Sequence, residues 1–279
     1  MASRTLTLCV RICIVISLSW ILFSYARFYF PASITTLPFP ALRIAHAGGG
    51  LDQHTYTNSL QALKQNVSRG FMLFEIDFSF TRDGHLVCLH DWGKSFYDNF
   101  GFTPSRPLSL DEFQQVLPKG HHTNCTLKSL SDWLQQHPHI RIVTDIKENN
   151  QQALALINQA IPDASQRVIP QIYHPEQFEP VKALGFKRII WTLYRFHGNT
   201  RQIRYWLGRF HGSIAITMPK HRAQQGLGVT LAQHKITTFV HTVNSPRELD
   251  ILKSKYQISE IYTDHLVPQP LNDVIDVSN

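Results

Sequence analysis

From residue 41 onward, short apolar runs alternate with amphipathic segments along the chain. The apolar runs are rich in isoleucine, valine and phenylalanine, as is typical of strands that are buried on both faces. They predict eight strands, at 42–46, 72–79, 140–146, 168–172, 188–193, 213–218, 237–243 and 260–263. A short return strand at 86–89 follows the turn signal Asp83-Gly84.

The segments between these runs predict helices at 58–68, 129–136, 149–160, 175–184, 200–207, 229–233 and 246–255. Regular alternation of strand and helix is typical of parallel βαβ units. Eight such units predict an α/β fold of the TIM type, a closed (β/α)8 barrel. The interval 92–128 is too long for an ordinary connection, so we interpret it as an insertion after the second strand with a short helix near 109–116.

The second predicted strand opens the stretch FEIDFSFTRDGHLVCLHDW, residues 74–92. Side chains alternate across a strand, so Glu75 and Asp77 share one face while Phe74 and Ile76 share the other. The aromatic face would pack against covering helices, which leaves the acidic face pointing into the barrel. Two like charges placed side by side there are costly unless a cation lies between them. A bound divalent metal is therefore expected.

The predicted strands place polar side chains at one end of the barrel. Active sites of TIM barrels lie at the carboxyl ends of the strands. The chemically capable residues of this sequence fall at those ends: His46, Glu75, Asp77, Asp145, Lys147, Gln171, Tyr194, Asn244 and Asp264. This placement is the main indication from the residues themselves that the chain is an enzyme.

Three acids, Glu75, Asp77 and Asp145, lie on neighbouring predicted strands. Ligation by oxygen alone suits a hard ion, Mg²⁺ or Ca²⁺, in preference to zinc. The alternative is a network of structural salt bridges, for example between Asp145 and Lys147. Two histidines, His46 and His90, are candidates for general base and general acid, because their pKa lies near the working pH. Their alternative is the ordinary role of hydrogen-bonded core histidines.

Four further residues are candidates for substrate binding. Lys147 is a candidate phosphate contact, and Gln171 and Tyr194 lie at later strand ends. Asn58 either caps the first helix or reaches the substrate, and both interpretations stay open. The glycine run 48–50 would let backbone amides approach an anion.

The N-terminal residues 6–30 are strongly apolar, with Arg4 and Arg11 at or near their start. Residues 12–26 are uncharged, which is short for a membrane span, but Arg11 can extend it towards the headgroups. We predict an uncleaved transmembrane signal anchor at 1–30, a linker at 31–40 and the catalytic barrel at 41–279. The competing interpretation is a cleaved signal peptide. An anchor would place the barrel on the periplasmic side of the cell inner membrane.

The net charge is +7, but lysines and arginines are scattered along the chain. No nucleic-acid-binding signature is present, so we expect no nucleic-acid partner. The four cysteines show no CxxC spacing, which argues against a zinc site. For Cys88 and Cys125 we favour two unpaired thiols over a disulfide.

The ordered set of motifs resembles the glycerophosphodiester phosphodiesterases, in the superfamily that also holds phosphatidylinositol-specific phospholipase C. That pattern begins with His-Arg-Gly, continues with Glu-Asn, Glu-x-Asp, Thr-x-Asp-Gly and His-Asp, and ends with Glu-x-Lys. The resemblance spans residues 42–266 and looks like a divergent HAGG-type member. The matching residues are His46-Ala47-Gly48, Thr57-Asn58, Glu75-Ile76-Asp77, Thr81-Arg82-Asp83-Gly84, His90-Asp91 and Asp145-Ile146-Lys147.

The resemblance implies a TIM barrel that hydrolyses a glycerophosphodiester or a phospholipid headgroup with the help of a divalent metal. By matching position, Glu75, Asp77 and Asp145 would hold the metal, and His46 and His90 would be the acid–base pair. Lys147 would contact the phosphate. The substrate would be a small molecule or a lipid.

Four residues depart from the family pattern, and one of them is His241, which stands where a tryptophan is common. Ala47 replaces the usual arginine, which removes a bidentate grip on phosphate. Thr57 replaces a glutamate, and Asp145 is one methylene shorter than the usual glutamate. The missing cation could be replaced by one of Lys94, His121, His122, Arg195 or Arg222. The alternative function is a non-catalytic envelope module that keeps the barrel and binds a phosphorylated lipid or glycan.

Overall fold

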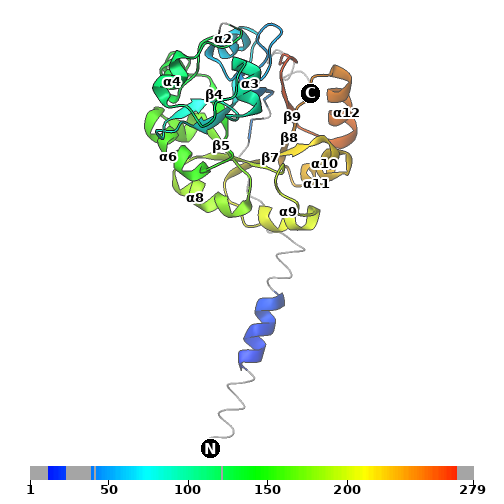
Figure 1. Ribbon diagram of the computed structural model, residues 1–279. Helices are drawn as coiled ribbons and strands as arrows, with labels where there is room; N and C mark the ends of the chain where they lie inside the picture. The colour runs from blue at the N-terminus through cyan, green and yellow to red at the C-terminus, as the bar shows by residue number, and fades with distance from the viewer. Residues whose placement is uncertain (1–11, 23–38, 41, 121, 269–279) are drawn as a thin grey trace, which may run out of the picture.

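Eight parallel strands form a closed barrel in the computed structural model, which describes residues 12–22, 39–40, 42–120 and 122–268. The barrel closes because β1 pairs with both β2 and β9. Figure 1 shows the helices arranged around these strands. The strands are β1 (Ile44–Ala45), β2 (Leu73–Phe80), β4 (Arg141–Asp145), β5 (Val168–Ile172), β6 (Arg188–Thr192), β7 (Ser213–Pro219), β8 (Thr237–His241) and β9 (Glu260–Thr263). The predicted TIM-type fold is confirmed.

The barrel interior is layered from apolar to acidic. A cluster of buried side chains fills the end where the strands begin: Ile44, Leu73, Val143, Ile169, Ile190, Ala215, Phe239 and Tyr262, together with Phe39. Two residues further along β2 the same face carries Glu75, and two beyond that Asp77. The parallel register sets Asp77 beside Asp145 of β4. The alternation of β2 therefore delivers its acids to the carboxyl end of the barrel.

Helices cover the outside of the barrel, and their inward faces form the larger apolar core with the outward face of the strands. Each helix expected between the strands is present: α2 (Leu60–Ser68), α5 (Leu127–Gln136), α6 (Asn150–Ala160), α8 (Phe178–Ala183), α9 (Thr200–Leu207), α11 (Leu227–Ala232) and α12 (Pro246–Tyr256). Two short helices, α7 (Ala164–Arg167) and α10 (Lys220–Gln224), were not expected, nor were the 3-10 turns η1 (His46–Gly48) and η2 (Pro175–Gln177).

The insertion at 92–128 shares a small core with the strand before it. That strand, β3 (Leu86–Cys88), pairs antiparallel with β2, and the insertion then adds α3 (Lys94–Phe100) and α4 (Leu110–Gln115). The sequence predicted β3 and α4 but not α3. The buried side chains Val87, Leu89, Phe96 and Phe113 hold this segment together. It reaches the rest of the barrel where Asn99 donates a hydrogen bond to the Tyr56 carbonyl, at 3.3 Å.

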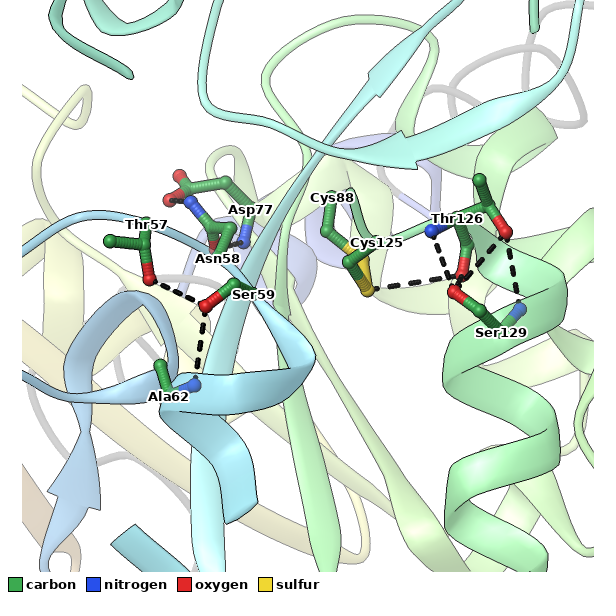
Figure 2. The surroundings of a disulfide bond; sticks show 9 residues. All are labelled: Thr57, Asn58, Ser59, Ala62, Asp77, Cys88, Cys125, Thr126 and Ser129. Atoms are coloured by element: carbon green, nitrogen blue, oxygen red, sulfur yellow. Dashed lines mark hydrogen bonds between the residues drawn. A yellow bond between two sulfur atoms is a disulfide. The ribbon is translucent and has the colours of Figure 1, made fainter. Parts of the chain in front are cut away.

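A disulfide joins β3 to the start of α5. Cys88 and Cys125 are paired, with their Cα atoms 5.2 Å apart, so the expectation of two unpaired thiols was wrong. Figure 2 shows the bond between β3 and the capping residues Thr126 and Ser129 of α5. The bond closes a loop with a sequence separation of 37. In the chain-entropy model such a loop contributes about 4 kcal/mol by restricting the unfolded chain.

The predicted transmembrane anchor falls largely outside the described residues. Residues 12–22 are helical and exposed, whereas 1–11 and 23–38 lie outside the description. Among the residues that can be described, no helix is long and apolar enough to cross a membrane. The anchor at 1–30 and the linker at 31–40 therefore stay predictions. Phe39 is described, and it packs edge-on against Phe239 at the apolar end of the barrel, with ring centroids 5.9 Å apart.

Candidate active site

Three acids converge at the carboxyl end of the barrel, as the sequence predicted. Glu75 and Asp77 come from β2, and Asp145 ends the neighbouring strand β4. One ligand atom from each lies within 4.8 Å of the others. Glu75 and Asp77 are almost fully buried, and Asp145 is half-buried. The set is compact enough for one cation to contact all three side chains.

The buried carboxylate of Glu75 lies beside two other acids and is only partly hydrogen-bonded. Its Oε2 accepts a hydrogen bond from the Ala47 amide at 2.8 Å, but its buried Oε1 has no hydrogen-bond partner among the described residues. Burial, followed by the charges of Asp77 and Asp145, raises the pKa of Glu75 well above its ordinary value. An unpartnered carboxylate oxygen at this depth costs free energy unless a positive group approaches it.

Lys147 neutralises part of this negative charge. Its Nζ lies 3.1 Å from Oδ1 of Asp77 and 3.1 Å from Oδ2 of Asp145. Burial works against the ammonium, but the two carboxylates outweigh it and raise the pKa of Lys147. The salt bridges weighed as an alternative are thus present beside the acid cluster. Three carboxylates and one ammonium leave an excess of two negative charges, which fits a divalent cation held by oxygen donors.

Asn58 holds Asp77 in place. The Asn58 side chain donates to Oδ2 of Asp77 at 3.0 Å and accepts from the Asp77 amide at 2.9 Å. Its φ of 48° is left-handed, a conformation that asparagine tolerates better than most residues. The helix cap is instead Ser59, which accepts a hydrogen bond from the Ala62 amide. The helix-cap interpretation of Asn58 was wrong, and contact with a substrate stays a prediction.

His46 is oriented by a relay of polar side chains. Its Nδ1 lies 2.8 Å from Oδ1 of Asp264, and Asn244 donates to the other oxygen of Asp264 at 2.7 Å. Burial favours the neutral acid, but the hydrogen bond and charge of His46, with the bond from Asn244, lower the pKa of Asp264. A carboxylate can only accept, so Nδ1 carries the proton and Nε2 is left with a free lone pair.

His90 is held in the same way from the insertion side. Its Nδ1 lies 2.6 Å from Oδ2 of Asp91. The other oxygen of Asp91 accepts from the amides of Gly93 and Ser95, at 2.8 and 3.1 Å. These bonds outweigh the effect of burial and lower the pKa of Asp91. Both predicted histidines therefore have a carboxylate on Nδ1 and leave Nε2 available for chemistry.

One family model matches part of the chain. The model of the glycerophosphoryl diester phosphodiesterase family matches residues 46–159, a segment that contains both histidines and all three acids. Over this segment the chain is similar to that family. No curated protein matches the sequence significantly.

Solved structures of glycerophosphodiester phosphodiesterases share the fold. The enzyme from Thermotoga maritima is 19% identical, with a TM-score of 0.61 over 82% of this chain and 96% of that chain. One from Parabacteroides distasonis is 16% identical, with a TM-score of 0.62 over 84% of this chain and 94% of that one. An Oleispira antarctica phosphodiesterase in complex with its product sn-glycerol-3-phosphate is 18% identical, with a TM-score of 0.60 over 84% and 96%.

Tyr56 lies between the two histidines, and no sequence pattern predicted its role. Its ring packs edge-on against His46 and His90, with ring centroids 4.6 and 5.2 Å away. Burial, followed by the charges of Asp77 and Glu75, raises the pKa of Tyr56, so the phenol stays protonated. Tyr56 sits at a left-handed φ of 65° in the loop before Asn58. The one sequence signal that could have indicated the role of Tyr56 is its position directly before Thr57-Asn58, which matches the Glu-Asn motif.

Two more site residues were missed. Tyr173 follows β5 and donates a hydrogen bond to Oδ1 of Asp145. Burial, followed by the charge of Asp145, raises its pKa, which keeps the phenol a donor. His241, where this family often has a tryptophan, lies at the end of β8 and contacts Thr217 at 3.0 Å. Burial, followed by repulsion from His46, lowers the pKa of His241 to about 4, so its ring is neutral near pH 7.

The remaining predicted residues lie around this centre. Gln171 is buried inside the barrel, where its Oε1 accepts a hydrogen bond from the Tyr262 hydroxyl at 2.9 Å. Tyr194 is 64% exposed, and its ring centroid is 6.0 Å from that of His241. The Tyr194 side chain is therefore accessible to a ligand at the mouth of the barrel. The Gln171 side chain is already hydrogen-bonded within the barrel. Substrate binding by either residue stays a prediction.

The glycine run does not form an anion cradle. The amides of Gly49 and Gly50 donate to the carbonyls of His46 and Asp264, both at 2.7 Å. The buried Asn66 side chain binds the Gly48 and Gly50 carbonyls. A Cβ at Gly49 would lie 2.5 Å from Nδ2 of Asn66. The glycines are thus required by close packing, and the expectation that they approach an anion was wrong.

One cation is well placed to replace the family's missing arginine. The Arg195 guanidinium lies over the Tyr173 ring, 4.9 Å from its centroid, and donates to the Lys147 carbonyl at 3.2 Å. It therefore borders the acid cluster from the β6 side. Arg222 binds the carbonyls of Phe196 and Gly198 instead, and Lys94 is paired with Asp98 at the surface.

Proposed function

We propose that this chain is a metal-dependent phosphodiester hydrolase that acts on glycerophosphodiester or phospholipid-headgroup substrates. The observation that carries the proposal is the pairing of a three-acid cluster with two histidines whose Nδ1 atoms are each fixed by a carboxylate. The match of residues 46–159 to the glycerophosphoryl diester phosphodiesterase family model supports the reaction class. The product bound by the Oleispira antarctica relative supports a glycerophosphate moiety in the substrate.

The two histidines divide the proton transfers. His46, with Nδ1 fixed by Asp264, acts as the general base. Its Nε2 takes a proton from the attacking hydroxyl, which belongs to water or to a neighbouring alcohol of the substrate. His90, with Nδ1 fixed by Asp91, acts as the general acid and protonates the leaving alcohol from Nε2. Tyr56 packs against both rings and keeps them at a fixed spacing.

The acid cluster and the nearby cationic side chains bind the phosphate and neutralise its charge. Glu75, Asp77 and Asp145 would hold the cation, which supplies charge neutralisation for the phosphate when it is bound. Asn58 keeps Asp77 oriented for this task. Lys147 contributes a fixed positive charge beside the phosphate oxygens. Arg195 takes the place of the arginine that Ala47 has lost.

Arg195→Ala is expected to raise KM for a glycerophosphodiester by about 10-fold or more and to lower kcat less, because a charge-assisted contact of ~1.5–3 kcal/mol with a ligand is lost. Arg222→Ala is the matched control, since that guanidinium binds backbone carbonyls away from the acids. Steady-state kinetics of both variants separate the effect on KM from the effect on kcat. Equal KM values for the parent and Arg195→Ala would remove Arg195 from the phosphate site.

Hydrolysis of glycerophosphocholine, glycerophosphoethanolamine and glycerophosphoglycerol tests the proposed function directly. Release of the alcohol is measured on the full chain with Mg²⁺, with Ca²⁺ and after treatment with EDTA. We expect turnover with at least one ion and its loss in EDTA. Turnover that persists after the metal is stripped would contradict the mechanism. Tight binding of the diester with no turnover under any condition would favour the non-catalytic binding module.

The location of the enzyme is part of the same proposal. We place the barrel outside the cytoplasm, on the periplasmic side of the inner membrane. The apolar N-terminal segment supports this location. The Cys88–Cys125 disulfide supports it as well, because disulfides persist in oxidising compartments and are rare in the cytosol.

A further inference from the structure

The end of the barrel opposite the acids carries a ring of positive charge. Each of the eight barrel strands has a lysine or arginine at its first position or within the five residues before it. We call these residues the basic end: Arg43, Arg69, Arg141, Arg167, Lys187, Arg188, Arg209, Lys235 and Lys255. The strands are parallel, so all of these positions lie at one end of the barrel.

Acids do not balance this charge. In the described chain the same eight segments contain two acids, Asp163 and Glu260. Glu260 is buried and already bound, with Oε1 3.0 Å from Arg43 and Oε2 2.7 Å from Lys253. The bases also repel one another: burial, followed by the charge of Arg141, lowers the pKa of Arg188. Arg43 and Arg167 have partners within the fold, since Arg43 binds Glu260 and Arg167 donates to the carbonyls of Leu134 and His137. Crowding of like charges costs stability, so the exposed bases of the ring are better explained by an anionic partner.

A cavity opens within the basic end. Its volume is about 930 Å³, and it lies between the start of β2, the segment before β4 and the last turn of α12. The lining combines the apolar side chains Val67, Phe71, Met72 and Ile140 with the exposed base Arg69 and with Glu260, which is paired with Arg43 and Lys253. Apolar walls beside cationic side chains suit an amphiphile with a negative headgroup.

The chain enters the barrel at this same end. Phe39 is 7% exposed and fixed against Phe239, close to the first residue of β1. If the membrane anchor ends near residue 30, residues 31–38 can span at most about 29 Å. A tether of that length holds the basic end nearer to the lipid than the acid cluster, which lies at the opposite end of the strands.

We propose that the basic end docks on a membrane surface of anionic phospholipid and that the catalytic mouth faces away from that membrane. What this orientation implies for the substrate rests on the proposed function. The substrate is then a water-soluble glycerophosphodiester, such as a deacylated phospholipid, and not an intact lipid of the membrane to which the enzyme is attached.

Headgroup quenching tests the orientation on the full chain in vesicles. A fluorophore is placed at Gln136→Cys, on the rim of the cavity, or at Glu176→Cys, which is exposed at the catalytic end, with Cys9 and Cys13 changed to serine. Vesicles contain a headgroup nitroxide lipid and either phosphatidylcholine alone or about 30% phosphatidylglycerol. We expect the fluorophore at residue 136 to be quenched only in vesicles that contain phosphatidylglycerol. This quenching should be weaker at about 500 mM than at about 50 mM NaCl, because salt screens the attraction between the bases and the headgroups. Quenching at residue 176 would overturn the proposal.

Matched charge reversals identify the responsible residues. Arg69→Glu/Lys187→Glu/Lys235→Glu changes three exposed bases of the basic end, and Lys64→Glu/Lys94→Glu/Lys128→Glu changes three exposed bases elsewhere. The first variant is expected to weaken docking on the order of 100-fold or more, and the control variant far less. Equal effects of the two variants would contradict docking by the basic end. Binding of single-stranded RNA by this face, without headgroup quenching, would also overturn the proposal and assign a nucleic-acid surface.

The same proteoliposomes separate this proposal from the proposed function. They are assayed once with soluble glycerophosphoglycerol and once without any soluble diester, so that the intact lipids of the bilayer are then the only phosphodiesters present. We expect hydrolysis of the soluble compound alone. Hydrolysis of the lipid in its own bilayer would overturn the orientation. If neither is hydrolysed while the quenching pattern holds, docking stands and the phosphodiesterase activity fails.

Discussion

His46→Ala and His90→Ala are each expected to lower kcat for a glycerophosphodiester by about 10²–10⁴-fold, because each removes one positioned proton-transfer group. KM should change less, since neither ring supplies the charge that holds the phosphate. His85→Ala is the matched control: it lies just before β3, which His90 follows, and it is exposed in the turn of the β2–β3 hairpin. The double variant is expected to lose little more than either single variant, because the two histidines act in one reaction.

The pH–rate profile distinguishes the two histidines from purely structural residues. The parent should show a bell-shaped dependence of kcat/KM, with one limb from the base and one from the acid. His46→Ala should remove the acidic limb, which reports protonation of the base, and His90→Ala the alkaline limb. Asp264→Asn should also reduce kcat, because an amide in place of the carboxylate no longer fixes the Nδ1 proton of His46. An unchanged profile in both alanine variants would exclude acid–base roles for them.

The barrel was predictable because its strands are buried on both faces and so form uninterrupted apolar runs. The run 168–172 coincides with β5, and the expected starts of β6, β7, β8 and β9 are the observed ones. The helices that escaped prediction are short. Helix α7 has four residues and α10 five, too few to show a helical period. Helix α3 is stabilised by packing of Phe96 within the insertion, which is a tertiary effect.

The acid cluster was predictable for a related reason. Alternation in β2 fixes Glu75 and Asp77 on one face, and parallel register brings Asp145 beside them. The supporting contacts depend on loop conformation, which carries no such period. Tyr56 and Asn58 both adopt left-handed φ values, and the bond from Asn58 to Asp77 follows from that local turn. The Cys88–Cys125 disulfide depends on the path of the insertion, which spacing alone does not define.

Glu75→Gln is expected to stabilise the metal-free protein by about 1–3 kcal/mol and to abolish its response to a divalent cation. The reason is that the carboxylate is fully buried beside two like charges and has one oxygen without a partner. A neutral amide of the same shape removes that repulsion. Catalytic turnover should fall in the same variant, because the cation loses one of its three ligands. Glu176→Gln is the control, since this acid is exposed on η2.

Thermal unfolding with and without cation measures both effects. For the parent, a cation at 100 times its Kd contributes about 2.7 kcal/mol. This raises Tm by roughly 5–10 °C for a domain of this size. Glu75→Gln should start from a higher Tm in EDTA and show little further rise with Mg²⁺ or Ca²⁺. A variant that is stabilised by the cation as strongly as the parent would remove Glu75 from the metal site.

The pH dependence of the metal-free protein gives a second readout with a defined sign. The folded-state pKa of Glu75 is raised above its ordinary value of 4.5, so the unfolded chain releases this proton first. Below pH 4.5 the side chain is neutral in both states and costs nothing. As pH rises towards the folded-state pKa, the stability of the parent therefore falls relative to Glu75→Gln. Saturating cation should reverse that trend, because it binds the ionised carboxylate and makes the buried charge favourable.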